Sequence, residues 1–139
     1  MKYFTIEELT RSETAERLDI DNTPDDDEVE HLKELTSVLD GLRESWGSPI
    51  LVTSGYRCRV LNKAVGGAKR SAHMCGYAVD MMPSNGLISA FKEHCLNYFK
   101  DADYDELILE KSGNTEWVHF ALYSIDGFQR GKCFVYDAK

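Results

Sequence analysis

Two histidines and one aspartate lie in sequence contexts that suggest a metal site. His73 follows a Gly-Gly break and precedes an apolar segment, whereas Asp80 and His119 each lie inside an apolar segment. A buried carboxylate without a partner is energetically costly, and a bound cation would remove that cost. Two imidazoles and one carboxylate also form a three-ligand zinc set that leaves a fourth position open for water. These residues therefore predict a zinc site of the catalytic type.

Glu116 stands three residues before His119 in a Glu-x-x-His pattern and is the candidate general base. A carboxylate near zinc-bound water can accept its proton and pass it to a leaving amine. Residues three apart in a regular strand face opposite sides, so this role requires Glu116 to precede the strand or to lie at a bulge. If Glu116 is not the base, the acids to test are Asp103, Asp105 and Glu110 in the stretch just before it.

Cys75 offers a different chemistry. It lies two residues from His73, and a thiol with a histidine base is a known nucleophilic arrangement. That spacing does not by itself supply the geometry, so a Cys-His peptidase is kept as an alternative. The four cysteines contain no C-x-x-C pair, and free thiols are the expectation in a reducing compartment.

Hydrophobic spacing predicts the elements that must position these residues. Thr23-Pro24 followed by four acids is typical of a capped helix start rather than of a calcium loop. Apolar residues then recur every three or four positions up to position 46, which predicts a long helix. The other predicted elements are short helical turns over 5–22, helices over 57–65 and 86–100, and strands over 50–53, 77–82, 106–109, 117–122 and 133–136. This order favours an α+β fold with an antiparallel β-sheet and flanking helices.

Length and charge limit the function classes. The 139 residues fit one domain, with a helical N-terminal part over 1–47 and the sheet and metal site over 48–139. A net charge of −8 argues against binding of nucleic acid or anionic lipid through bulk charge. No run of apolar residues approaches the roughly 18 that a membrane span needs.

A set of motifs extends across the central part of the chain. The motifs are Ser54-Gly55-Tyr56-Arg57, Leu61-Asn62, Val65-Gly66-Gly67, Ser71-x-His73, Gly76-x-Ala78-x-Asp80 and Glu116-Trp117-Val118-His119-Phe120. Together they resemble the zinc D-alanyl-D-alanine carboxypeptidase family, which includes phage and bacterial peptidoglycan peptidases and has a Hedgehog-like fold. The resemblance is dense over residues 48–123, and the segment from Phe4 to Pro24 is similar to short phage members.

The resemblance implies zinc coordination by His73, Asp80 and His119, and general acid–base catalysis by Glu116. It implies further that Arg57 faces the substrate, where its planar guanidinium holds a carboxylate or stabilises an oxyanion. Ser71 would donate its hydroxyl to the bound peptide.

The function implied by the resemblance is zinc-dependent hydrolysis of a peptide bond in peptidoglycan stem peptides, of the D-Ala-D-Ala carboxypeptidase or L-Ala-D-Glu endopeptidase type, as in a phage or prophage lysin. The N-terminus shows no signal-peptide pattern. We therefore expect a monomer that is cytoplasmic as synthesised and reaches the cell wall after release or by an export route that the sequence does not encode. An alternative is a non-catalytic zinc-containing wall-binding module of the same fold, which loss of Glu116 or of a ligand would indicate.

Overall fold

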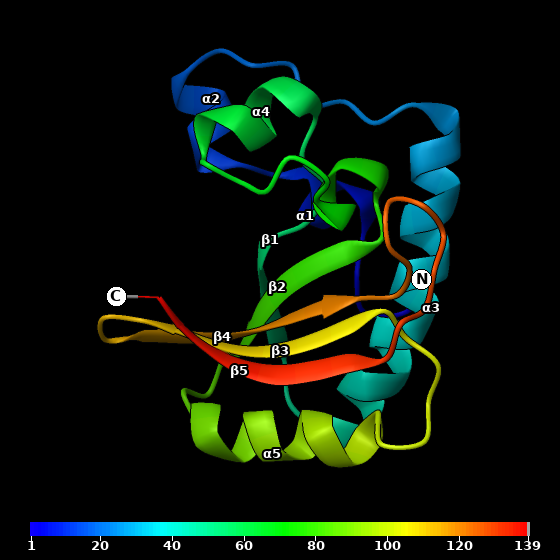
Figure 1. Cartoon of the computed structure of the whole chain (residues 1–139), viewed down its shortest axis with the longest axis vertical. Helices are drawn as coiled ribbons and strands as arrows, with labels where there is room; N and C mark the ends of the chain where they lie inside the picture. Colours follow the sequence, from blue (N-terminus) through cyan, green and yellow to red (C-terminus); the bar gives the residue numbers. More distant parts are fainter. Residues whose placement is uncertain (139) are drawn as a thin grey trace.

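The long helix predicted from hydrophobic spacing is α3 (Asp26–Trp46) in the computed structural model of the chain, which describes residues 1–138 (Figure 1). A capping box closes its first turn: the Asp25 side chain accepts a hydrogen bond from the backbone N–H of Glu28, and the Glu28 side chain accepts one from the backbone N–H of Asp25. The acidic cluster is therefore a helix start, as predicted. The buried face of α3 carries Leu32, Leu35, Thr36, Leu39 and Leu42.

The remaining helices are short. Helices α1 (Ile6–Thr10) and α2 (Glu13–Arg17) begin at the N-caps Thr5 and Ser12, whose side chains accept backbone hydrogen bonds in the first turn. The others are α4 (Arg59–Ala64), the 3₁₀ helix η1 (Ala72–Cys75) and α5 (Ile88–Tyr98). Within residues 1–138, none of the helices has the length and apolar character that crossing a membrane requires.

Five strands form one sheet in the order β1-β2-β4-β3-β5. They are β1 (Ile50–Ser54), β2 (Ala78–Pro83), β3 (Glu106–Ser112), β4 (Thr115–Ala121) and β5 (Lys132–Ala138). The α+β fold with flanking helices is confirmed, and the first four strands pair antiparallel as expected.

Strand β5 differs from the expectation because it pairs parallel with β3. The reason lies in where β4 ends. Ala121, the last residue of β4, is opposite Glu106, the first residue of β3, and β5 begins with Lys132 beside that same Glu106. A chain that returns to the sheet at the starting end of β3 must run in the direction of β3.

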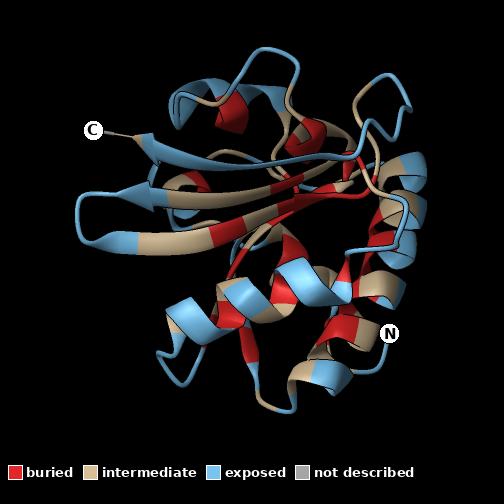
Figure 2. Ribbon diagram, turned by 60° about the horizontal axis from the view of Figure 1, so that its bottom comes forward, coloured by how far each residue is buried: buried red, intermediate tan, exposed pale blue. Residues whose placement is uncertain are grey.

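One face of the sheet packs against α3 and α5 and forms the hydrophobic core (Figure 2). Val79 and Met81 of β2 are fully buried there together with Phe91 of α5. Because side chains alternate along a strand, Asp80 faces the opposite side of the sheet, and His119 of β4 does the same. The sheet thus separates an apolar face from a face on which polar side chains can meet.

Gly76 ends η1 and leads the chain into β2. Its φ of 86° lies in the left-handed region, and its N–H donates a hydrogen bond to the carbonyl oxygen of Ala72. A Cβ atom on Gly76 would lie 2.9 Å from the carbonyl oxygen of Glu28 in α3. The turn therefore requires glycine both for its backbone conformation and for its close approach to α3.

We expect Gly76→Ala to lower the free energy of unfolding by more than Gly113→Ala does. Both glycines have positive φ, which costs a non-glycine residue about 1–2 kcal/mol. Only at Gly76 does the added methyl group meet backbone, because the space around Gly113 is open. Denaturant titration of both variants measures the difference. Equal losses would show that the approach to α3 does not constrain this turn.

Candidate metal centre

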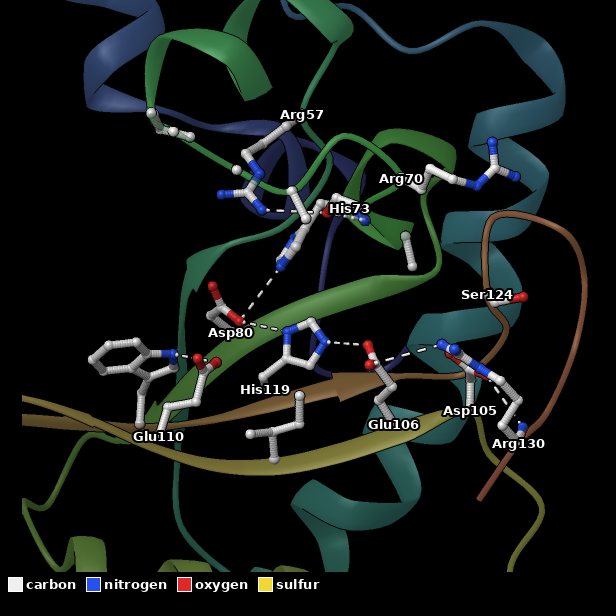
Figure 3. A pocket seen from close by; sticks show the side chains of 18 residues that line it. Arg57, Arg70, His73, Asp80, Asp105, Glu106, Glu110, His119, Ser124 and Arg130 are labelled. Carbon is white, nitrogen blue, oxygen red and sulfur yellow. Dashed lines mark hydrogen bonds and ion pairs between the residues drawn. The ribbon is translucent and has the colours of Figure 1, made fainter. Parts of the chain in front are cut away.

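Asp80 and His119 are directly opposite each other in the antiparallel pair of β2 and β4. Directly opposed side chains lie on one face of a sheet, and His119 Nδ1 is 3.0 Å from Asp80 Oδ1. His73 approaches the same carboxylate oxygen from η1, with its Nε2 3.4 Å away (Figure 3). One ligand atom from each of the three residues lies within 4.8 Å of the other two. The structure therefore brings together the three residues predicted to form the metal site.

Each imidazole is held through the ring nitrogen that points away from Asp80. His73 Nδ1 lies 2.7 Å from the carbonyl oxygen of Gly55, and His119 Nε2 lies 3.2 Å from Glu106 Oε1. Because a carbonyl oxygen only accepts, Nδ1 of His73 carries the proton and Nε2 keeps a lone pair. Metal-binding histidines typically have a partner of this kind on the second nitrogen.

The donor set fits zinc. Two imidazole nitrogens and one carboxylate oxygen suit zinc, whereas calcium and magnesium prefer oxygen ligands. His73 is only 2% exposed, Asp80 and His119 are partly buried, and all three line a cavity of about 410 Å³. The cavity extends past these three residues to Arg57, Ser71 and Glu110, which leaves room for water and substrate.

The environment shifts the pKa values of all three residues. Burial lowers the pKa of His73 and outweighs the opposing charge of Asp80. Burial also disfavours the charged form of His119, but hydrogen bonds to Asp80 and Glu106 outweigh it and raise the pKa of His119 to about 9. Burial would raise the pKa of Asp80, but the two imidazoles hold it well below its usual range. At neutral pH, therefore, Asp80 and His73 are already in the forms that bind metal.

Arg57 and Ser71, for which the resemblance implies contact with substrate, line the same cavity. Arg57 Nη2 donates to Ser71 Oγ at 3.5 Å, and Ser71 Oγ also accepts from the backbone N–H of His73 at 3.1 Å. Burial lowers the pKa of Arg57, although a guanidinium stays charged in a protein. Within residues 1–138 the buried Nε of Arg57 has no hydrogen-bond partner. Arg57 therefore has donor capacity that the fold does not use.

Glu116 is not brought to this cavity. The register of β4 is regular, with Glu116 opposite Lys111, and residues 115–121 contain no bulge. The side chain faces α5, where Lys92 Nζ lies 2.7 Å from its Oε1. The structure therefore contradicts the expectation that Glu116 and His119 serve one site, because residues three apart in a regular strand face opposite sides.

Two glutamates of β3 line the cavity in its place, namely Glu106 and Glu110. Ile108, which lies between them, is opposite His119, so alternation puts both carboxylates on the face of the metal site. Glu110 is one of the acids named above as substitutes for Glu116, whereas sequence reasoning missed Glu106. The sequence signal that could have found Glu106 is the pair of acids Glu106 and Glu110, placed two residues on either side of Ile108. This spacing points to the metal site only once the register between β3 and β4 is known.

The two glutamates differ in their electrostatic environment. Burial and the charge of Asp80 raise the pKa of Glu110, and Trp117 Nε1–H donates to its Oε2 at 3.0 Å. The hydrogen bond from His119 instead lowers the pKa of Glu106. Figure 3 shows both carboxylates on the same side of the sheet as Asp80 and His119.

Cys75 lies outside this cavity. Its thiol donates to the carbonyl oxygen of Ala72 at 3.2 Å, and it lines a separate cavity beside His31 and Tyr77. Burial raises the pKa of the Cys75 thiol. Because a nucleophilic cysteine needs a lowered pKa and an adjacent base, this geometry disfavours Cys-His catalysis.

Comparison with protein families places the chain in a family of metallopeptidases. The sequence matches the family model of peptidase M15 over residues 2–121. The chain therefore belongs to peptidase family M15, the zinc D-Ala-D-Ala carboxypeptidase type, as the motifs indicated. Peptidases of this family are zinc-dependent and act on peptidoglycan. A comparison with curated proteins found no similar sequence.

We expect the purified protein to bind one zinc ion per chain and His73→Ala to lose most of it, because the variant lacks one of three ligands. Arg57→Ala is the matched control, since Arg57 lines the same cavity but offers no ligand atom. Elemental analysis after dialysis measures zinc content in both variants. Full zinc content in His73→Ala would remove His73 from the ligand set.

Proposed function

We propose that the protein is a zinc peptidase that cleaves a peptide bond in peptidoglycan stem peptides, as a D-Ala-D-Ala carboxypeptidase or an L-Ala-D-Glu endopeptidase, and that it serves as a phage or prophage lysin. The observation that carries the proposal is the convergence of His73, Asp80 and His119 on one cavity in a chain of family M15. We assign these three residues as the metal ligands.

The metal and the protein divide the chemistry. A bound zinc ion supplies Lewis-acid activation of water and of the scissile carbonyl group. The residues of the chain have to orient the peptide, move one proton from water to the leaving amine, and stabilise negative charge on the carbonyl oxygen. The cavity beside the ligands contains one side chain suited to each of these last two tasks.

We assign proton transfer to Glu110. Glu110 lines the same cavity as the three ligands, and it lies two residues along β3 from Ile108, which is opposite His119. Trp117 holds Oε2, which leaves Oε1 able to accept a proton from water and return it to the leaving amine. Its raised pKa makes Glu110 a better proton acceptor than an ordinary surface carboxylate.

We assign substrate binding to Arg57, with Ser71 beside it. The planar guanidinium matches a carboxylate of the peptide, and its unused Nε–H can also donate to a developing oxyanion. The two roles are separable by kinetics. If Arg57 only binds the substrate, Arg57→Ala will have a higher KM and an unchanged kcat. If Arg57 stabilises the oxyanion, Arg57→Ala will have a lower kcat.

Digestion of purified peptidoglycan, followed by mass spectrometry, tests the function. We expect zinc-loaded protein to release D-alanine from intact stem peptides or to free peptides that begin at D-Glu, and the mass identifies the bond. A chelator should abolish this release, and iodoacetamide should not. A folded, zinc-loaded protein that binds the wall without cleaving it would instead be a binding module. If iodoacetamide inhibited cleavage and the chelator did not, the result would indicate catalysis by Cys75.

We expect Glu110→Gln to lower turnover by roughly 10²–10⁴, the usual contribution of a positioned general acid–base group. Glu116→Gln is the matched control, because it makes the same chemical change on the opposite face of the sheet and should retain turnover. Zinc content should be unchanged in both variants. The reverse pattern, with turnover lost only in Glu116→Gln, would return the general-base role to Glu116.

A further inference from the structure

We propose that Glu106 is a positioning residue for His119 and that Arg130, itself held by Asp105, keeps Glu106 in place. The inference rests on the metal site of the proposed function. It adds three residues that neither the sequence motifs nor the proposed reaction uses, and one of them, Arg130, lies beyond residues 2–121 that match the family.

Glu106 contacts the metal site through only one of its two carboxylate oxygens. Oε1 lies 3.2 Å from His119 Nε2, whereas Oε2 faces Arg130 Nη2 at 3.8 Å (Figure 3). The two nitrogens of an imidazole point in different directions, and it is Nδ1 that faces Asp80. Glu106 is therefore on the far side of the ring from the ligand cluster, where it can orient His119 but cannot be a fourth ligand.

This contact determines what His119 can do. When a metal is bound, a carboxylate beside Nε2 favours the neutral tautomer that carries its proton there, which leaves the lone pair of Nδ1 for the metal on the side of the ring that faces Asp80. It also opposes rotation of the ring. Glu106 uses one oxygen for His119 and the other for an ion pair with Arg130, whereas among residues 1–138 only Oε2 of Glu110 has a hydrogen-bond partner. Glu106 therefore suits a positioning role and Glu110 a catalytic one.

Arg130 is fixed by three contacts with Asp105. Its Nε and Nη2 lie 2.7 and 2.8 Å from the two carboxylate oxygens of Asp105, and its backbone N–H donates to Oδ1 at 3.1 Å. Asp105 is only 1% exposed, so the pair is held in a defined geometry. The backbone N–H of Lys132 also donates to the Asp105 carbonyl oxygen at 2.9 Å. The segment before β5 thereby places a positive charge against Glu106.

Zinc affinity of the full-length protein, measured by competition with a chromophoric chelator, tests the proposal. We expect Glu106→Ala to weaken zinc binding by about 10–100-fold, the usual effect of removing a carboxylate behind a ligating histidine. Glu106→Gln retains an acceptor oxygen and should lose less zinc affinity than Glu106→Ala. Arg130→Met should also lower zinc affinity, although Arg130 itself does not contact His119. Glu44→Ala is the control, because it removes a carboxylate from a surface ion pair with Lys2, in which both side chains are exposed.

The ¹⁵N chemical shifts of the His119 ring provide a second readout, which a general loss of stability would not move. In the zinc-loaded protein we expect a proton on Nε2 and metal on Nδ1, and in Glu106→Ala a mixture of ring states. If Glu106→Ala does not fold, Glu106→Gln carries the comparison. Unchanged affinity and unchanged ring shifts in the Glu106 variant would overturn this inference alone. Failure of the wild-type protein to bind zinc would overturn the proposed function as well.

Discussion

The pairing of Asp80 with His119 across β2 and β4 is the contact on which the site depends. Its position is set by the core on the other face of the sheet, where Val79 and Met81 are fully buried. A slip of one residue in either strand would exchange the two faces, exposing apolar side chains and burying the polar pair against α5. Hydrophobic packing therefore determines the geometry of a polar site that it does not touch.

The other groups of the site reach this pair from separate elements. The backbone after β1 holds His73 twice, through the Gly55 carbonyl oxygen on its ring and through the Arg57 N–H, which donates to the His73 carbonyl oxygen at 3.0 Å. Strand β3 contributes Glu106 on the far side of His119. Such a partly buried cluster of charges is tolerated because each member has an oppositely charged or hydrogen-bonding neighbour. Its energetic cost is offset by contacts from five parts of the chain, namely β2, β4, η1, the backbone after β1, and β3.

Local sequence signals predict the long helix, the positions of the strands and the three residues that meet in the cavity, but not the 3₁₀ helix η1. The long helix has a capped start and a regular apolar spacing. Asp80 and His119 are recognisable because a polar side chain in an apolar strand is costly to bury unless it has a partner. The general base that we propose, Glu110, is not accessible in the same way. The Glu-x-x-His spacing drew attention to Glu116, although strand alternation argued against it. Choosing Glu110 instead requires the register between β3 and β4, which is a property of the folded sheet.

Residues that depend on tertiary structure escaped prediction for the same reason. The direction of β5 follows from where β4 ends, and no local pattern in the last strand encodes it. Arg130 reaches Asp105 and Glu106 only because the chain returns to the starting end of β3. Sequence reasoning could find the proposed ligands from their chemistry, but not Glu106 and Arg130, the charged residues beyond His119.

The hydrogen bonds around the ligand residues have a consequence for how the protein matures. Asp80 contacts both imidazoles, and each imidazole has a second partner in the protein, so the cluster is satisfied by the chain itself. This differs from small zinc domains, in which the metal drives folding. We therefore expect folding to come first and metal acquisition second, as a separate and reversible step. On that expectation, the metal supply that the folded protein meets sets the active fraction, which can change without any new synthesis.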